Sequence, residues 1–237
     1  MLEESNLLGA LRQKERALLK PFMTECHLAA GETIYEPGQV VRYAYFPRNS
    51  ALAVFLVMME NGEVVETTMV GREGALGGIV SQGSVPCYAR SCVMHEGDFY
   101  RISSVDLEQV KEQSPQIRHL FARYADCMMA QVFQSVACNA SHTIEQRAAK
   151  WLCAALDRTG KDEIAMTQEQ LASMMGIGRS YASRVVQRFK GDGIIQTRRG
   201  GLKVLNPEGL RSRACGCNEL VKQHFETVLK GVYPNGD

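Results

Sequence analysis

The sequence predicts an α+β fold in which short antiparallel strands come first and helices follow. Turn-bounded runs of β-branched and aromatic residues stop near residue 103, and apolar residues at three- and four-residue spacing begin near residue 114. Residues 1–137 carry 12 Lys and Arg against 16 Asp and Glu, whereas residues 138–237 carry 15 against 10. An acidic first part and a basic last part indicate two domains with different partners.

Residues 1–113 are expected to form an antiparallel β-roll, similar to a jelly roll, that acts as an effector or sensor domain. The strongest sign is Asn61-Gly62, a hairpin turn between the runs RYAYFPRNSALAVFLVMM and EVVETTMV. Pro37-Gly38 and Glu96-Gly97-Asp98 mark two further turns. Many short strands separated by such turns are typical of rolls and small barrels.

Residues 114–140 are expected to form a long central helix. Ser114 is a suitable N-cap, and Pro115 fits the first helical position, where a missing N–H costs nothing. The apolar stripe of this helix could pack on the β-roll or pair with a second copy of the chain, and the sequence leaves both open. As a dimer contact, the stripe comprises Ile117, Leu120, Phe121, Tyr124, Met128, Val132 and Val136.

Residues 141–237 are expected to form a winged helix-turn-helix. Thr167 and Gln170 form a capping box at the start of one helix, and Gly176 permits a tight turn. The helix that follows has one apolar side and one side that is basic, with hydroxyl and amide groups but no carboxylate. A solvated helix face usually mixes charge signs, so this face predicts a recognition helix in the major groove of DNA.

Two short strands around Arg198-Arg199-Gly200-Gly201 would form the wing. The alternative is a solvated basic helix beside a helical hairpin, but cap, turn, basic face and wing together favour DNA binding. The residues expected to contact DNA are Thr167, Gln168, Arg179, Ser180, Tyr181, Ser183, Arg184, Arg188, Arg198 and Arg199.

The start of the sequence and its apolar runs indicate in which compartment of the cell the protein acts. The first 22 residues are charged throughout and lack the pattern of a secretory signal. The longest apolar run, Ala51–Met59, is too short to cross a bilayer. We therefore expect a cytoplasmic protein without membrane contact.

The cysteines and histidines suggest neither a metal site nor an enzyme. The eight cysteines lack the paired spacing of a disulfide framework. Cys215 and Cys217, with His224 downstream, could hold a metal, but the sequence shows no second cluster to complete four ligands, so no metal site is expected. Residues 28–102 contain only His95, and no catalytic arrangement stands out, so we expect no catalytic residues.

The order of β-roll, long helix and winged helix-turn-helix resembles the Crp/Fnr family of bacterial transcription regulators over essentially the whole chain. The resemblance is most specific at TQEQLASMMGIGRSYASRVVQRFKGDGII and fair at VGREGALGGIVSQGSVPCYARSCV. It implies a β-roll like a cyclic-nucleotide-binding domain and a homodimer joined through the central helix. It also implies a two-fold symmetric DNA operator and, for an activator, RNA polymerase as a partner.

The chain departs from the nucleotide-binding members of that family. Their Gly-Glu-Leu is replaced around Gly77-Gly78, which offers no carboxylate. Their Arg-Ser pair aligns with Tyr88-Ala89, although a two-residue shift would bring in Arg90-Ser91. Apolar residues stand where the central helix should offer two hydroxyl groups. We therefore expect no cyclic AMP binding. The residues expected around an effector are Gly77, Gly78, Tyr88, Ala89, Arg90, Ser91, Val132 and Phe133.

The effector itself stays unknown at this point. The iron–sulfur branch of the family uses an N-terminal cysteine cluster, and only Cys26 is present here, so no iron–sulfur cluster is expected. Besides a regulator that senses another effector, two alternatives remain. One is a regulator without a ligand, controlled by abundance or by oxidation of Cys127, Cys138 or Cys153. The other, more distant, is a metal-dependent enzyme on the β-roll.

Overall fold

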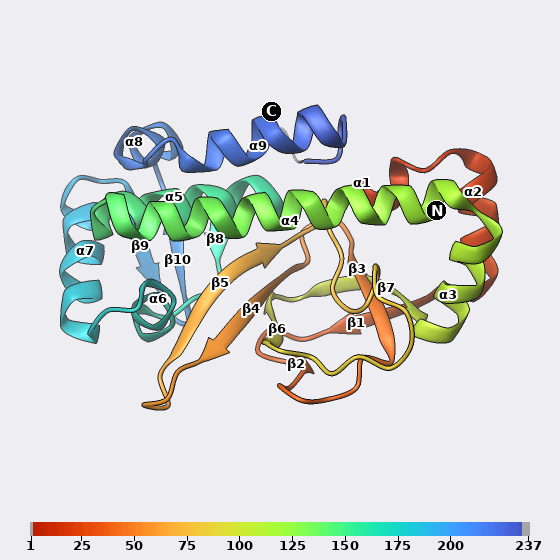
Figure 1. The fold of residues 1–237 in the computed structure, drawn as a ribbon. Coiled ribbons are helices and arrows are strands. Elements are labelled where there is room, and N and C mark those ends of the chain that lie inside the picture. The colour runs from red at the N-terminus through yellow and green to blue at the C-terminus, as the bar shows by residue number, and fades with distance from the viewer. Residues whose placement is uncertain (1, 234–237) are drawn as a thin grey trace.

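The computed structural model describes residues 2–233, and its N-terminal strands form two antiparallel sheets (Figure 1). The sheets have the strand orders β1-β7-β3 and β2-β6-β4-β5, and they share an apolar core that includes Val70, Val93 and Phe99. The antiparallel β-roll predicted from the sequence is thus confirmed. Its strands are β1 (Thr24–Leu28), β2 (Thr33–Tyr35), β3 (Tyr43–Pro47), β4 (Leu52–Met58), β5 (Val64–Val70), β6 (Arg90–His95) and β7 (Gly97–Ser103).

The hairpin of β4 and β5 forms where Asn61-Gly62 predicts a turn. Gly62 has a φ of 80°, a left-handed conformation that glycine adopts without steric cost. The side chain of Asn61 accepts a hydrogen bond from the backbone amide of Glu63 and so closes the turn. The hairpin extends toward the C-terminal part of the molecule, where β5 lies against helix α6 (Gln168–Met175) (Figure 1). There the hydroxyl of Ser173 donates a hydrogen bond to the carbonyl oxygen of Val64.

Short helices flank the roll and pack at one end of the central helix (Figure 1). The helix α3 begins at the N-cap Ser103, whose hydroxyl accepts a hydrogen bond from the amide of Asp106. These elements enclose an apolar cluster with the first half of the central helix. They are η1 (Leu2–Glu4), α1 (Asn6–Gly9), α2 (Gln13–Leu19), η2 (Lys20–Phe22) and α3 (Ser104–Gln113).

The predicted long helix is α4 (Pro115–Ser141), whose 27 residues extend for about 40 Å along the molecule (Figure 1). Ser114 is the N-cap in extended conformation, but its side chain makes no capping hydrogen bond. The helix ends at His142, and a second long helix, α5 (Ile144–Thr159), begins almost at once. Only two residues therefore separate α4 from the C-terminal domain.

The apolar stripe of α4 is divided between the inside and the outside of the chain. Ile117, Phe121 and Tyr124 are buried in the chain's own core. The ring centre of Phe121 lies 5.9 Å from that of Phe46 in β3, and that of Tyr124 lies 6.4 Å from that of Phe225. The expectation that the whole stripe contacts a partner needs correction for these three, because the β-roll and the C-terminal helix already cover them.

The rest of the stripe is more accessible. Leu120 and Met128 are half-buried, and Val132 and Val136 are exposed. Two further apolar side chains on the same part of α4 are exposed: Met129, at 53%, and Phe133, at 67%. The accessible apolar face of α4 therefore lies in its second half.

The C-terminal region contains the helices and the wing expected of a winged helix-turn-helix. The wing sheet has the order β8-β10-β9, so it has three strands rather than the predicted two. The last helix turns back and runs along α4 (Figure 1). After α5 the elements are β8 (Glu163–Ile164), α6, α7 (Arg179–Gly191), β9 (Ile195–Arg198), β10 (Gly201–Val204), α8 (Pro207–Arg213) and α9 (Cys217–Val228).

The β-roll and the C-terminal domain share one apolar core. Leu52, Val54 and Met69 of the roll belong to the same buried cluster as Trp151 and Leu152 of α5. Among residues 2–233, no helix is long and apolar enough to cross a membrane.

Candidate nucleic-acid interface

The first helix of the candidate DNA-reading motif is α6, and the structure has the capping box predicted at its start. The amide of Gln170 donates to the Thr167 hydroxyl at 3.1 Å, and the amide of Thr167 donates to the Gln170 side chain at 2.8 Å. The helix ends at Gly176, whose φ of 62° is left-handed and would strain any larger residue. Ala172 is buried, and its small side chain lets α6 and α7 cross closely.

The second helix, α7, has the two faces that its sequence predicts. Ala182, Val185, Val186 and Phe189 are buried and belong to the core or lie beside it. The other side chains face solvent, apart from Ser183, which is half-buried. The exposed ones are Arg179, Ser180, Tyr181, Arg184, Gln187, Arg188 and Lys190.

Four predicted arginines carry charges that no carboxylate among residues 2–233 pairs with. Arg179 and Arg184 lie on α7, and Arg198 and Arg199 lie at the tip of the wing. In the part of the chain that the structure describes, none of the four forms an ion pair. The Arg184 guanidinium lies 4.9 Å from the ring centre of Tyr181, a cation–π contact that orients it. These charges are available to an anionic partner.

Arg188 differs from these four. Its guanidinium lies 2.6 Å from a carboxylate oxygen of Glu145 in the first turn of α5, and the other oxygen of Glu145 pairs with Arg213 at 2.9 Å. Hydrogen bonds from Arg188 and then from Arg213 lower the pKa of the Glu145 carboxyl. Arg188 thus ties α7 to α5, and its charge is already partly neutralised.

The wing and the start of α6 complete the candidate interface. Gly200, with a φ of 77°, forms the tight turn between β9 and β10, and it leaves Arg198 and Arg199 exposed. Thr167 is exposed and Gln168 is half-buried. One open depression is lined by residues of all three elements, among them Thr167, Gln168, Arg179 and Arg198. The structure therefore brings together groups from α6, α7 and the wing.

The predicted effector residues do not offer a free charge for a phosphate. The Nε of Arg90 donates to a Glu36 carboxylate oxygen at 2.8 Å, so this charge is paired. Ser91 is fully buried where β6 pairs with β2 and β4. Gly77, with a φ of 100°, lies tight against the Tyr43 backbone, where any larger residue would clash.

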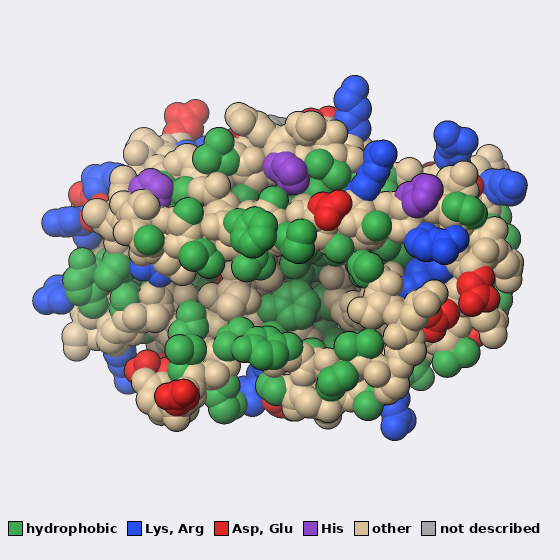
Figure 2. Space-filling view, in the orientation of Figure 1, with side chains coloured by type: hydrophobic (Ala, Val, Ile, Leu, Met, Phe, Trp, Pro, Cys, Tyr) green, Lys and Arg blue, Asp and Glu red, His purple; other side chains and the backbone are tan. Residues whose placement is uncertain are grey.

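The remaining predicted effector residues are scattered. Gly78 and Ala89 are half-buried, and Tyr88 is 85% exposed. Val132 and Phe133 lie on the accessible side of α4. Figure 2 shows hydrophobic side chains gathered along α4 and on the β-roll around a hollow between them.

Sequence analysis missed two polar contacts between the β-roll and α5. The guanidinium of Arg158 is 1% exposed and pairs with the equally buried Glu73 at 2.8 Å. The indole N–H of Trp151 donates to Glu66 of β5 at 2.6 Å, and burial raises the pKa of the Glu66 carboxyl to about 8. Partners this far apart in the sequence give no local signal, although Glu73 lies in the GREGAL stretch that supports the family resemblance.

Comparisons with known proteins agree with this geometry. Residues 146–213 match the family model of the Crp-like helix-turn-helix domain. A transcriptional regulator of the Crp/Fnr family from Eubacterium rectale has the same fold, with a TM-score of 0.64 at 14% identity over 90% of this chain and 97% of that one.

FixK2 from Bradyrhizobium japonicum gives a TM-score of 0.65 at 16% identity, over 81% of this chain and 98% of its own. A CRP-family regulator from Thermus thermophilus gives a TM-score of 0.67 at 18% identity, over 80% of this chain and 96% of its own. No curated protein matches the sequence.

The family-model match assigns residues 146–213 to the Crp-like helix-turn-helix domains, the class of domain that carries the exposed basic face. Over the rest of the chain, the fold is that of solved regulators described as Crp/Fnr-family or CRP-family proteins. The resemblance drawn from the sequence is therefore confirmed for the helix-turn-helix domain and for the fold.

Proposed function

We propose that the protein is a homodimeric, sequence-specific DNA-binding regulator whose β-roll responds to an effector other than cyclic AMP. The observation that carries the proposal is the set of unpaired guanidinium groups on α7 and the wing. Buried or paired arginines have structural roles, whereas exposed and unpaired ones on a recognition helix suit guanine edges and phosphates. As a regulator of bacterial genes the protein would act in the cytoplasm and, as an activator, would contact RNA polymerase.

The positions of the residues suggest which of them read base edges and which bind phosphates. Arg179, Ser180, Tyr181, Ser183 and Arg184 lie on the exposed part of α7 that enters the major groove. Arginine forms a bidentate pair with the O6 and N7 atoms of guanine, so Arg184 is assigned to base reading. Accessible groups outside that helix are assigned to the phosphate backbone. These are the exposed Thr167, Arg198 and Arg199 and the half-buried Gln168.

The dimer would form through the second half of α4. Met129, Val132, Phe133 and Val136 follow the spacing i, i+3, i+4 and i+7, which makes one continuous apolar strip on a helix. Exposed apolar side chains in such a strip are typical of a helix that pairs with its own copy. Two-fold symmetry would then present two α7 helices to half-sites about one turn of duplex apart.

Cyclic AMP does not fit the proposed sensor. Gly78 supplies no carboxylate for a ribose hydroxyl, and the charge of Arg90 is engaged by Glu36. Phe133 and Val132 offer no hydrogen bond to a base. The alternative of a regulator without any small-molecule effector is tested by the same experiment, since it would bind its operator equally well with and without cell extract.

The experiment is selection of duplexes from a random pool by the full-length protein, followed by fluorescence anisotropy on the selected sequences. A DNA-reading protein binds the selected duplex at least about 1,000-fold more tightly than bulk duplex at the same salt concentration. Both affinities are measured at several salt concentrations, because phosphate contacts make them salt-dependent. Equal affinity for selected and bulk duplex, with or without extract, would reject the proposal.

A further inference from the structure

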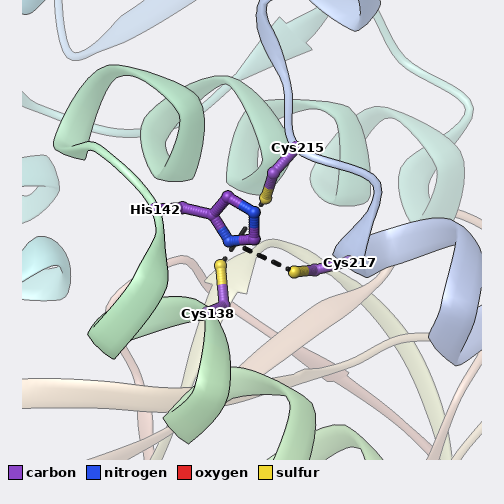
Figure 3. A group of neighbouring side chains, drawn as sticks. All are labelled: Cys138, His142, Cys215 and Cys217. Carbon is purple, nitrogen blue, oxygen red and sulfur yellow. Dashed lines mark hydrogen bonds between the residues drawn. The ribbon is translucent and has the colours of Figure 1, made fainter.

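Four metal-ligating side chains from two distant parts of the chain meet beside the junction of α4 and α5 (Figure 3). Cys138 lies in the last turn of α4, and His142 follows as its C-cap. Cys215 lies in the link between α8 and α9, and Cys217 is the first residue of α9. The three sulfur atoms and a ring nitrogen all lie within 4.8 Å of one another.

The distances fit a single tetrahedral cation. The Sγ atoms of Cys138 and Cys215 are 3.6 Å apart, and so are the Sγ atom of Cys217 and the Nδ1 atom of His142. Four ligands held at about 2.0–2.3 Å from zinc lie about 3.3–3.8 Å from one another. The two separations fall in that range, and the other pairs lie within 4.8 Å, so small movements of the side chains would bring all four atoms to one ion.

We propose that Cys138, His142, Cys215 and Cys217 bind one Zn²⁺ ion in a closed, structural site. The sequence suggests Cys215 and Cys217 as ligands together with His224, but His224 lies exposed outside the cluster. The expectation that no second cluster completes four ligands is wrong, because α4 supplies the second pair. Cys138 lies in the last turn of α4, and the backbone amide of the C-cap His142 donates to its carbonyl oxygen at 3.0 Å, so both side chains leave the same end of the helix.

The donor set identifies the class of metal. Thiolate and imidazole ligands in a tetrahedral arrangement favour zinc over the hard cations Mg²⁺ and Ca²⁺, which take oxygen ligands. Four protein ligands leave no open position, so the site has a structural rather than a catalytic form. An iron–sulfur cluster would need its ligand sulfurs spread around several metal atoms, farther apart than these are.

The surroundings of the cluster also suit a bound cation. Cys138, Cys215 and Cys217 are 0%, 7% and 3% exposed, so solvent does not compete for them. The side-chain amide of Gln134, one turn before Cys138, donates to the Sγ atom of Cys217 at 3.2 Å. A hydrogen bond from outside the ligand set holds a thiolate in place, and such supporting contacts tune many metal sites.

The ion would join two elements, α4 and α9, at the point where the chain passes into the C-terminal domain. It would hold the end of α4, its cap His142 and the start of α9, and only Thr143 separates His142 from α5. The site would therefore fix the angle between α4 and the DNA-reading helices. Binding of the metal does not rest on the proposed function, but an effect of the metal on DNA affinity does.

The test measures metal content and metal binding in the full-length protein. Protein purified under reducing conditions is analysed by elemental mass spectrometry, with one zinc per chain expected. X-ray absorption at the zinc edge should show three sulfur ligands at about 2.3 Å and one nitrogen at about 2.0–2.1 Å. Chelator-treated protein, kept reduced, is then titrated with Zn²⁺ and with Co²⁺, whose visible absorption reports tetrahedral thiolate ligation.

Matched variants separate the site from general effects on folding. His142→Ala and Cys217→Ser should weaken Zn²⁺ binding at least 100-fold, whereas His224→Ala and Cys153→Ser should leave it unchanged. Circular dichroism identifies any variant that does not fold. If a ligand variant does not fold, the Co²⁺ spectrum of the wild-type protein decides whether the site is tetrahedral and contains thiolate ligands. The Tm of the wild type should fall on zinc removal and recover on its return, because a ligand that binds only the folded state stabilises it.

Different results would contradict the zinc site and the proposed function. Substoichiometric zinc together with a failure to take up Zn²⁺ or Co²⁺ would overturn the proposal, as would iron with acid-labile sulfide. A Cys138–Cys215 disulfide in protein kept reduced would overturn it in favour of a thiol switch. Stoichiometric zinc in a protein that binds no selected duplex would support the metal site and reject the proposed function instead.

Discussion

The arginines of the α4–α5 region and those of the α7 surface have the same chemistry and opposite environments. Arg158 is buried, pairs with Glu73 and lies over the ring of Tyr233, with its guanidinium carbon 4.9 Å from the ring centre. Arg184 is exposed, and its guanidinium carbon lies 4.9 Å from the ring centre of Tyr181 without a carboxylate partner among residues 2–233. The two residues are of the same type, so the difference lies in their pairing. A paired, buried arginine connects two domains, whereas an unpaired, exposed arginine is available to DNA.

The largest effect is expected from breaking the buried pair. Glu73→Ala should lower the free energy of unfolding by about 3–5 kcal/mol, because it leaves Arg158 buried without its counter-ion. Urea denaturation measures the change. The exposed pair of Glu3 and Arg16 is the control, since Glu3→Ala should cost less than about 1 kcal/mol. Equal losses for the two variants would show that the buried pair does not connect the domains.

The same comparison applies to two phenylalanines of α4, Phe121 inside and Phe133 outside. Phe133→Asp should shift the chain from dimer to monomer, with a loss of about 2 kcal/mol or more in association free energy. The folded monomer should keep its stability because the side chain is 67% exposed. Sedimentation velocity measures association. Val105→Asp, at a 68% exposed position on α3, is the control, and dissociation of both variants alike would contradict the assignment.

A smaller effect should separate two exposed arginines from one another. Arg184→Ala should lower discrimination at one base-pair position by about 1–3 kcal/mol. Arg199→Ala should weaken binding to all duplexes alike and reduce the salt dependence by about one phosphate contact. Anisotropy with single-base variants of the selected duplex measures both. Identical profiles for the two substitutions would remove the distinction between base reading and phosphate binding.

The smallest effect should come from the partly neutralised charge of Arg188. Glu145→Gln frees this guanidinium and should strengthen binding to every duplex a few-fold, by about 1 kcal/mol or less. The pKa of Glu145 is lowered in the folded chain, so the stability that its charge adds is lost as the pH falls through that pKa. Anisotropy at neutral pH gives the first change, and urea denaturation from pH 7 to pH 3 gives the second. Unchanged DNA affinity would show that Arg188 lies away from the phosphates.

Local patterns made the DNA-reading end predictable from the sequence. The Thr167–Gln170 capping box, the turn at Gly176 and the apolar side of α7 each depend on residues within one or two helical turns. The hairpin at Asn61-Gly62 is local in the same way. Local backbone chemistry and helix periodicity therefore made most of the helices, strands and turns predictable.

Contacts between distant segments could not be predicted in this way. Which part of the α4 stripe is buried depends on α9, whose Phe225 packs on Tyr124 from 101 residues later in the chain. The pairing of Arg188 with Glu145 depends on how α7 meets α5. The cluster of Cys138, His142, Cys215 and Cys217 likewise appears only when the two chain segments come together.

The hydrogen bond from Ser173 to Val64 makes the β4–β5 hairpin a support on which α6 rests. Residues of this hairpin therefore belong to the surroundings of the helix-turn-helix even though Val64 lies 109 residues before Ser173 in the chain. A deletion that shortened the hairpin would leave α6 without this neighbour, and its consequence would be felt at a surface to which the hairpin itself contributes no basic side chain.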